Sequence, residues 1–475
     1  MTEYALTILA PHMDKLKKHL FQSDLRERAA YILLGTNEIS ADPWDQKART
    51  KYVTHEVIPV HDDDVISHDA MHITWSTQSF VRALKKAKDQ RMTLGVIHSH
   101  TGGYAGFSKQ DDANEPDLVQ LTQNRNGTDA DLVSVVMTPD EQIFGRVWHN
   151  VSNNTDMSYI HILGDRFALH YPKRNQGFDR DIFNRQALAF GQALTQDMSK
   201  LRIGVVGCGG TGSALLTLLH RIGIGHLALF DADIVELSNL NRLHGATVED
   251  AANKAFKVDV AKREIERTGL PIKVLAFPHW IDHQACQIPL KSCDLIFGCT
   301  DDNDGRILLN LISHHYGIPV IDMGLAIEVS DEDIPRMIAC DGRVTMIMPG
   351  LPCLQCRGVI NPLLAREEEI KRNDPQEYQR LKAEAYVAGE GNPAPVVATF
   401  TTETATMSVN ELLHRYQGFR GTDGHSNHRV RKFHYETEDR MPGVKVNDKC
   451  PVCGQTKSWG RADDTRFLGM MERVK

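Results

Sequence analysis

The stretch that decides the fold is LRIGVVGCGGTGSALLTLL, residues 201–219. Its apolar beginning predicts a buried strand, and its glycine-rich turn leads into an apolar helix, SALLTLLHRIG (213–223). A second strand, HLALFD (226–231), follows within a few residues. Because strand, glycine turn, helix and strand in this order form a βαβ unit, we expect a mostly parallel sheet of the α/β class.

The glycine turn also predicts a nucleotide site. Gly207, Gly209, Gly210 and Gly212 lie between the strand and the helix. Glycine permits a tight turn there and lets backbone N–H groups approach a phosphate at the helix N-terminus. Asp231 closes the next strand, 19 residues after Gly212, where a carboxylate can bind a ribose hydroxyl. These features alone describe a NAD-dependent oxidoreductase equally well.

Residues further along favour ATP over NAD. Three motifs supply polar and charged groups: Asn239 and Arg242 in SNLNR (238–242), Lys257 in KAFKVDVAK (254–262), and Asp301 in CTDDNDGR (299–306). Asp301 follows a predicted strand, DLIFGCT, and could hold Mg²⁺. Cations and a metal around phosphates suit attack at phosphorus rather than hydride transfer.

A second cluster of chemistry-bearing residues lies in VIHSHTGGYAGFSKQDDAN, residues 96–114. His98 and His100 point to the same face of a strand, and Asp111 follows a glycine-rich loop that can fold back toward them. Three such ligands would leave the fourth position of a zinc ion to water, whose pKa zinc lowers from about 15.7 to about 7. Two alternatives remain: an isolated H-x-H that only packs, and a helix capping box formed by Ser108 and Asp111.

The elements around this cluster predict a separate α/β domain over residues 1–155. Strand-like runs occupy residues 29–35, 52–60, 93–100, 132–138 and 143–149, with a predicted helix at 79–90. The following segment is polar and turn-rich, so we expect a linker over residues 156–180 and a second domain over 181–475.

Four of the nine cysteines form two C-x-x-C pairs, CLQC and CPVC. Thiolates from Cys353, Cys356, Cys450 and Cys453 would make a closed tetrahedral zinc site of the structural kind. The alternative is a redox C-x-x-C, but two pairs in a chain whose first residues lack a secretory pattern favour a metal.

Length and composition set the remaining limits. The 475 residues are too many for one core, and the hydrophobic content of 41% with 24% charged residues is that of a globular protein. The net charge of −8 argues against nucleic acid as a partner. Since no apolar run reaches about 18 residues, we expect no membrane span and a cytoplasmic protein.

The cluster in residues 96–114 resembles the JAMM motif of MPN-type metalloproteases, because H-S-H, seven residues, Ser, two residues and Asp match it at each defined position. The resemblance covers roughly residues 1–150. It implies that His98, His100 and Asp111 hold zinc, that Ser108 stabilises the oxyanion, and that the domain cleaves a peptide or isopeptide bond beside the C-terminus of a ubiquitin-like protein.

The JAMM family also uses an upstream glutamate as general base. Glu27, which precedes RAAYILLG, is our candidate. Its spacing to Gly35 is one residue longer than in the family members compared, and one residue reverses the face of a strand. Glu56 and Asp24 are the alternatives.

The second half resembles the ThiF superfamily, the adenylation domain of ubiquitin-activating enzymes and molybdopterin-synthase adenylyltransferases, from about Phe183 to Cys453. The similarity rests on FNRQALAFG, the glycine turn, DADIVELSNLNR, the lysine, CTDDN and both C-x-x-C pairs. It implies that AMP is attached to the C-terminal carboxylate of a small ubiquitin-like protein, usually one that ends in Gly-Gly, and that pyrophosphate leaves.

The resemblance also implies a role for each matching residue. Asp231 would bind the ribose of ATP, Asp301 would bind Mg²⁺, and Asn239, Arg242 and Lys257 would contact the triphosphate. Arg185, in FNRQALAFG, would reach across a homodimer into the partner's site.

Many relatives carry a catalytic cysteine in a crossover segment between the two C-x-x-C pairs. This chain has no cysteine between Cys356 and Cys450, and the expected crossover, residues 385–408, offers only threonines. We therefore expect activation to stop at the acyl adenylate, which an external thiol or amine would collect.

The leading functional hypothesis joins both sites on one substrate: the first domain trims or removes a ubiquitin-like protein, and the second adenylates its C-terminus. Such fusions resemble those of bacterial ubiquitin-like conjugation or sulfur-transfer systems, some of them associated with phage defence, which would supply a conjugating enzyme or a sulfurtransferase as acceptor. The alternatives are activation of a sulfur carrier for cofactor or cysteine synthesis, a binding scaffold, and, more distantly, a NAD-dependent oxidoreductase.

Overall fold

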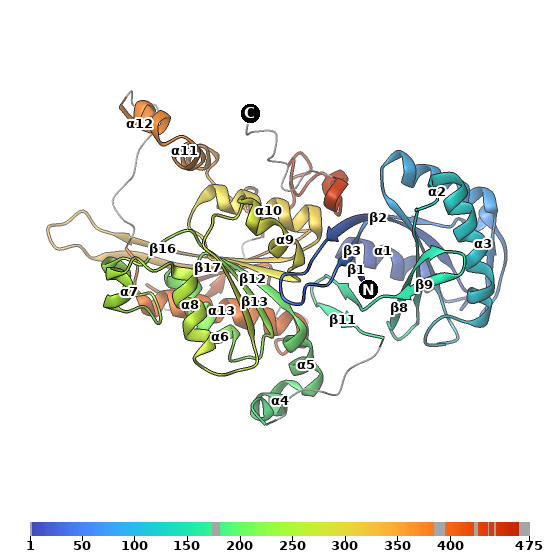
Figure 1. Cartoon of the computed structure of the whole chain (residues 1–475), viewed down its shortest axis with the longest axis horizontal. Helices are drawn as coiled ribbons and strands as arrows, with labels where there is room; N and C mark the ends of the chain where they lie inside the picture. Colours follow the sequence, from blue (N-terminus) through green and yellow to red (C-terminus); the bar gives the residue numbers. More distant parts are fainter. Residues whose placement is uncertain are drawn as a thin grey trace. The chain divides into compact units, whose positions relative to one another are not determined.

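The computed structural model describes residues 2–172, 181–383, 395–421, 426–435, 437–440 and 443–464. The chain divides into two compact units. Unit 1 consists of Met1–Gly177, His315–Gly317 and Thr456–Lys475, and unit 2 consists of Phe178–His314 and Ile318–Gln455. Figure 1 colours both units along the sequence.

Unit 1 is built on a sheet whose described strands follow the order β11-β10-β1-β3-β2-β6-β7-β8-β9. Parallel and antiparallel pairs mix, with β6 parallel to β7 and antiparallel to β2. Its elements are β1 (Glu3–Ile8), α1 (Ala10–Leu20), β2 (Ala29–Ile39), β3 (Arg49–Pro59), η1 (Asp62–Asp64), β4 (Val65–His68), β5 (Ile73–Trp75), α2 (Thr77–Asp89), β6 (Thr93–Ser99), α3 (Lys109–Asn126), β7 (Leu132–Met137), β8 (Ile143–Asn150), β9 (Asn153–Asp156), β10 (Tyr159–Ile162), β11 (Ala168–His170), η3 (Thr456–Ser458) and η4 (Ala462–Asp464).

Two apolar cores cover the two faces of this sheet. On one face α1 contributes Met13, Leu16 and Leu20 to a core with the strands. On the other face α2 and α3 pack against the sheet through side chains that include Phe80 and Val119. The expected strands are present as β2, β3, β6, β7 and β8, and the expected helix is α2.

Two differences from the expected domain limits arise from long-range pairing. Residues 159–170 of the expected linker form β10 and β11, because the short apolar run at Tyr159–Ile162 is buried beside β1. Residues 456–464 group with unit 1, where Trp459 O bonds the His55 ring at 2.6 Å and Asp463 accepts from the Glu38 N–H at 2.7 Å. The limits 1–155, 156–180 and 181–475 remain a proposal.

Unit 2 has a second sheet, in the described order β14-β13-β12-β15-β16-β17-β18-β19. Its elements are α4 (Asn184–Phe190), α5 (Gln192–Lys200), β12 (Arg202–Val206), α6 (Gly210–Leu219), β13 (His226–Phe230), η2 (Leu237–Asn239), α7 (Val248–Ala252), α8 (Lys257–Glu266), β14 (Lys273–Phe277), α9 (Gln284–Ser292), β15 (Leu295–Gly298), α10 (Asn303–Tyr316), β16 (Val320–Val329), β17 (Met337–Ile347), α11 (Pro362–Asn373), α12 (Pro375–Ala383), α13 (Ala398–Gln417), β18 (His428–Lys432) and β19 (Thr437–Arg440).

The parallel part of this sheet is doubly wound. Strands β14, β13, β12, β15 and β16 are parallel, and β17 to β19 continue the sheet antiparallel. Helices α6, α8 and α13 cover one face and α9 and α10 the other (Figure 1). From β12 the chain adds strands in both directions along the sheet, so the connecting helices cover opposite faces. This change of direction leaves a crevice at the carboxyl ends of the central strands.

The glycine turn explains how β12 and α6 meet. Gly207 has a φ of 91°, which favours glycine, and a Cβ there would lie 2.8 Å from the Cys299 carbonyl carbon. A Cβ on Gly212 would lie 1.9 Å from the carbonyl oxygen of Gly207. The expected βαβ unit is confirmed, and Gly212 is needed for close packing of helix on strand.

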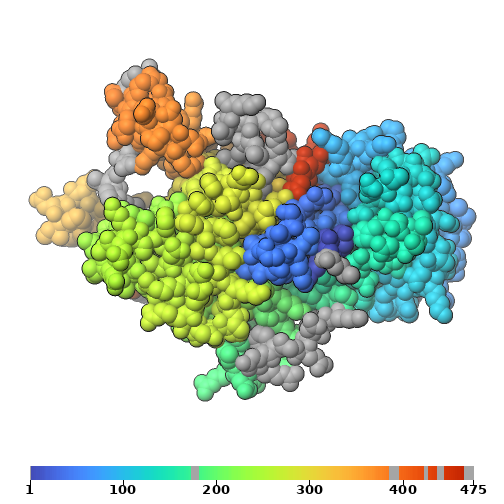
Figure 2. Space-filling view, in the orientation of Figure 1, coloured from blue at the N-terminus to red at the C-terminus, as the bar shows by residue number. Residues whose placement is uncertain are grey.

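Parts of unit 2 project from its sheet. Figure 2 shows α11 and α12 (orange) as a lobe outside the rest of unit 2. The expected crossover segment, residues 385–408, lies in part outside the described residues, and its second half from Ala398 forms the start of α13. Across the part of the chain that the structure describes, no helix combines the length and apolar character needed to cross a membrane.

Low pH is expected to reduce the folding stability of unit 2 because of His428. This side chain is buried and hydrogen-bonded to Thr345 Oγ1 at 2.9 Å. Burial, together with Arg357 and Arg343, lowers the pKa of His428 to about 4. Since the unfolded chain takes up this proton near its ordinary pKa of about 6.5, the contribution to stability is complete above that pH and is lost as the pH falls toward 4.

The His428→Gln variant should therefore show a smaller fall in Tm than the wild type when the pH is lowered from about 7 to about 5. Scanning calorimetry at the two pH values measures this difference. Equal falls in both proteins would contradict it.

Candidate active sites

In unit 1, β6 and α3 bring the predicted zinc ligands together. β6 ends at Ser99, one residue after His98, and His98 lies opposite Ala29 of β2. Ser108 is the N-cap of α3: its hydroxyl accepts from the Asp111 N–H, and the Asp111 carboxylate accepts from the Ser108 N–H at 2.6 Å. The capping box and the metal cluster are therefore compatible, because Asp111 offers its carboxylate to both.

The geometry of this cluster fits zinc. His98 Nε2 lies 3.1 Å from His100 Nε2 and 3.1 Å from Asp111 Oδ1, and His100 Nε2 lies 3.4 Å from Asp111 Oδ2. A tetrahedral zinc ion with bonds of about 2.05 Å holds its ligand atoms roughly 3.3 Å apart. Burial raises the pKa of Asp111, but hydrogen bonds with His100 and His98 outweigh that effect and hold the pKa well below its usual value. Asp111 is therefore an anion that could bind a metal ion.

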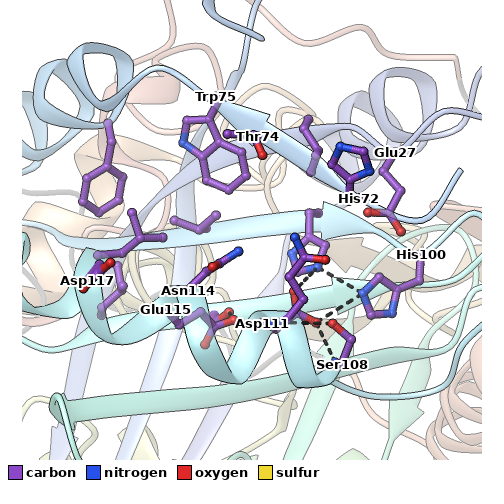
Figure 3. Close-up of a pocket in the computed structure, with 18 of the residues that line it drawn as sticks. Glu27, His72, Thr74, Trp75, His100, Ser108, Asp111, Asn114, Glu115 and Asp117 are labelled. Atoms are coloured by element: carbon purple, nitrogen blue, oxygen red, sulfur yellow. Dashed lines mark hydrogen bonds and ion pairs between the residues drawn. The ribbon is translucent and has the colours of Figure 1, made fainter. Parts of the chain in front are cut away.

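Glu27 lies in the same cavity. It is buried, and it lines a space of about 370 Å³ together with both histidines and Asp111 (Figure 3). Burial raises the pKa of Glu27, while the nearby imidazoles oppose that rise. In contrast, Glu56 pairs with Lys86 at 2.6 Å and Asp24 with Arg28 at 2.7 Å, and neither is among the described residues that line the cavity.

Much of the cavity wall consists of residues that were not predicted from the sequence. The β4–β5 hairpin contributes Met71, His72 and Trp75, and α3 contributes Glu115 and Leu118. Trp75 and His72 lie on the opposite side of the cavity from α3 (Figure 3). The short strands β4 and β5 carry no periodic signal, so nothing in the local sequence would have assigned these residues to the site.

In unit 2, the predicted nucleotide residues line one cavity of about 440 Å³ at the carboxyl ends of the parallel strands. The cavity is lined by Gly207, Gly209, Gly210, Asp231, Asn239, Arg242, Lys257 and Asp301. Gly212 and Arg185 are not among its described lining residues. Gly212 packs against the turn instead, and Arg185 is exposed on α4, a helix with no buried residue in the structure.

Asp231 and Lys257 are ionisable residues that line this cavity. Asp231 accepts hydrogen bonds from the N–H groups of Cys208 at 2.6 Å and Asp233 at 2.8 Å, and burial raises its pKa. Lys257 Nζ lies 2.7 Å from Asp233 Oδ2. Burial opposes the charge of Lys257, but Asp231 and Asp233 raise its pKa above the usual value, so it remains a cation.

Further residues of the cavity wall were not predicted from the sequence, among them Pro395, Val396, Thr401, His279 and Trp280. The indole of Trp280 donates to Asp302 at 2.9 Å. Because these residues come from α13, the segment before it and the segment after β14, only the tertiary fold brings them together.

The four cysteines of the two C-x-x-C pairs form one cluster. Cys353 Sγ lies 3.7 Å from Cys450 Sγ, and Cys356 Sγ lies 3.5 Å from Cys453 Sγ. A tetrahedral zinc ion with Zn–S bonds of about 2.3 Å sets its sulfur atoms roughly 3.8 Å apart, whereas a disulfide needs about 2.05 Å. Although burial raises it, the N–H groups of Cys453 and Val452 lower the pKa of Cys450 to about 7. Burial raises the pKa of Cys353 and Cys356, so a bound zinc ion would displace the protons of those two thiols.

The Cys453→Ser variant should fail to bind the zinc ion that this cluster could hold and should have a Tm lower by about 10 °C or more, since the metal would join segments about a hundred residues apart. Metal analysis should give about one zinc ion fewer per chain. Cys340→Ser is the matched control, because Cys340 is also buried but lies outside the cluster. Equal zinc content in the two variants would exclude the four-cysteine site.

The fold and these clusters define a two-domain α/β protein with a His-His-Asp centre in one domain and a glycine-turn nucleotide cavity in the other. The ThiF family model matches residues 183–454, and the model of prokaryotic homologs of the JAB domain matches residues 9–151. The chain therefore belongs to the ThiF family and carries an N-terminal JAB domain, as its resemblance to JAMM/MPN metalloproteases had indicated.

Individual relatives match only in part. The chain is 30% identical over 149 residues to the adenylyltransferase and sulfurtransferase UBA4 of Debaryomyces hansenii, covering 30% of this chain and 33% of that protein. It is 29% identical over 191 residues to the ubiquitin-like modifier-activating enzyme 5 of Gallus gallus, covering 38% and 46%. The chain thus spans less than half the length of these curated relatives.

Among solved structures, E. coli MccB with ATP gives a TM-score of 0.43 at 18% identity, covering 59% of this chain and 76% of that chain. E. coli MccB with MccA-N7isoASN gives a TM-score of 0.44 at 17% identity, with the same coverage.

Proposed function

We propose that this chain is a bifunctional enzyme of a prokaryotic ubiquitin-like system. Its first site would be a zinc-dependent peptidase or isopeptidase, and its second an ATP- and Mg²⁺-dependent adenylyltransferase for the C-terminal carboxylate of the same ubiquitin-like protein. The observation that carries the proposal is the joint presence of a zinc-compatible cluster with a buried glutamate and a nucleotide cavity lined by a lysine, an arginine and carboxylates.

The residues of unit 1 suit amide hydrolysis. Zinc held by His98, His100 and Asp111 would activate water and polarise the scissile carbonyl. Glu27 would accept the proton of the attacking water and return it to the leaving amine, a role favoured by its raised pKa. The Ser108 hydroxyl would donate to the oxygen of the former carbonyl as negative charge develops there.

The residues of unit 2 suit adenylation. A carboxylate oxygen of the substrate would attack the α-phosphorus of ATP, forming a mixed anhydride with AMP while pyrophosphate leaves. Asn239, Arg242 and Lys257 would offset the charge of the triphosphate, Asp301 would hold Mg²⁺, and Asp231 would bind the ribose. The positions of these side chains in one cavity support this assignment.

The acyl adenylate would pass to an external thiol or amine. Cys208, Cys286, Cys293 and Cys340 are buried, and burial raises the pKa of the pocket residue Cys299 well above its usual value. The conjugating route would use an acceptor enzyme, as in antiphage conjugation. Activation of a sulfur carrier is the second candidate, and the name of the UBA4 relative, an adenylyltransferase and sulfurtransferase, favours it.

A homodimer would complete the second site. Arg185 lies on α4, whose residues are exposed or half-buried, and it does not line the cavity of its own chain within the described residues. This arrangement suits an arginine that reaches a partner's nucleotide.

Ligand-dependent stability tests the nucleotide assignment. ATP with Mg²⁺ should raise the Tm, by an amount that grows with ligand concentration, while NAD should leave it unchanged. A Tm raised by NAD and not by ATP would overturn the proposed adenylation and restore the oxidoreductase alternative.

A further inference from the structure

Arg146, on β8, joins the sheet of unit 1 to the first turns of α3. Its side chain is buried, with Nε 2.8 Å from Glu115 Oε2 and Nη1 2.6 Å from Asp112 Oδ1. Its guanidinium also stacks on the ring of Phe107, 3.9 Å from the ring centroid. One side chain of the sheet therefore contacts three residues that span the start of the helix.

Glu115 is itself held in place. Its carboxylate accepts from Ser134 Oγ of β7 at 2.5 Å and from Trp148 Nε1 of β8 at 2.5 Å, as well as from Arg146. The carboxylate therefore accepts three hydrogen bonds, and Arg146 Nη2 also lies 2.8 Å from Glu115 Oε2 as an ion-pair contact. Because the ion pair between Arg146 and Glu115 is buried and its carboxylate is held by three donors, it fixes α3 against the sheet rather than acting as a surface pair.

The segment between these anchors carries two residues of the candidate hydrolytic site. Ser108 and Asp111 lie between Phe107 and Asp112, all of which follow a loop with three glycines, Gly102, Gly103 and Gly106. His98 lies in β6, and His100 directly follows Ser99, the last residue of that strand. The glycine-rich loop cannot by itself fix the distance from Asp111 to the histidines, since glycine leaves the backbone free.

We propose that Arg146 is the positioning residue of the hydrolytic site, and that it sets the distance between Asp111 on α3 and the histidines at the end of β6. The inference rests on the proposed zinc-dependent hydrolysis. Groups that orient metal ligands from outside the coordination sphere typically change metal affinity by about 10–100-fold when they are replaced. Arg146 would act in this way through the helix, without touching the metal.

Cobalt binding to the full chain tests this inference directly. Co²⁺ in a His-His-Asp site gives ligand-field bands without the thiolate charge-transfer band of the four-cysteine site, so the two sites are distinguished in one titration. The Arg146→Met variant should bind Co²⁺ at the non-thiolate site about 10–100-fold more weakly, with the four-cysteine signal unchanged. Arg125→Met is the control, because Arg125 lies in the last turn of the same helix, far along it from Asp111.

A second variant separates positioning from stability. Removal of Arg146 alone leaves Glu115 buried without its cation, which is expected to destabilise unit 1. Glu115→Gln with Arg146→Met removes that buried charge and should restore much of the Tm. The weak cobalt affinity should persist, since Asp112 and Phe107 still lack their partner.

The outcomes are distinct. Wild-type affinity for Co²⁺ in the folded double variant would overturn the positioning role and leave the proposed hydrolysis intact. Absence of the non-thiolate cobalt spectrum from the wild-type protein would overturn the proposed hydrolysis and, with it, this inference.

Discussion

The Glu27→Gln variant is expected to cleave a ubiquitin-like precursor about 10²–10⁴-fold more slowly than the wild type, with its zinc content unchanged. Glutamine keeps the shape of the side chain but cannot accept the proton of the attacking water. Because burial raises the pKa of Glu27, and only its carboxylate form accepts a proton, the wild-type rate should also fall as the pH is lowered through that raised pKa. Steady-state cleavage of an extended precursor measures both effects.

Glu56→Gln is the matched control for this variant. Glu56 was an alternative candidate for the general base, but its carboxylate pairs with Lys86 at 2.6 Å outside the cavity. The control should cleave at close to the wild-type rate. A slow Glu56→Gln variant beside an active Glu27→Gln variant would reverse the assignment of the base.

The Lys257→Ala variant is expected to lose about 10²–10³-fold in ATP–pyrophosphate exchange. Lys257 remains charged in the cavity, because Asp231 and Asp233 outweigh the effect of burial on its pKa. When ATP binds, the Lys257 ammonium group would move from Asp233 to the phosphates. Without Lys257, no ammonium group would offset the negative charge that develops on pyrophosphate.

Lys262→Ala provides the control for the nucleotide site. Lys262 lies on the same helix, α8, but its side chain is 38% exposed and it pairs with Glu266 at 3.8 Å. Exchange should be unaffected by this change. Full exchange activity in Lys257→Ala, with a candidate ubiquitin-like protein that supports the wild type, would contradict the assignment of the triphosphate site.

The parts of both sites that depend on local pattern were predictable from the sequence. Alternation along a strand places His98 and His100 on one face, and the capping box fixes where α3 begins. The glycine turn predicted the βαβ unit because Gly207 and Gly212 have no room for a Cβ. Strand order then follows from the rules of parallel sheets, which gather Asp231 and Asp301 at one edge.

The parts that depend on distant pairing were not predictable. β10 lies in a polar, turn-rich segment and is stabilised by its pairing with β1, which lies about 150 residues earlier in the chain. Arg146 looks like an ordinary charged residue of a strand until α3 packs over it. Trp280 reaches the nucleotide cavity only because β14 ends beside β13. In each case the local sequence is compatible with several partners, and tertiary packing selects one.

Intact-mass spectrometry gives the most direct test that both sites act in succession on one C-terminus. The purified chain would be incubated with ATP, Mg²⁺ and a small β-grasp protein that carries extra residues after Gly-Gly. We predict that the wild type trims this precursor and adds AMP to the new carboxylate, that Glu27→Gln does neither, and that Lys257→Ala trims without adding AMP. Addition of AMP to the untrimmed precursor, or trimming that persists in Glu27→Gln, would contradict the account.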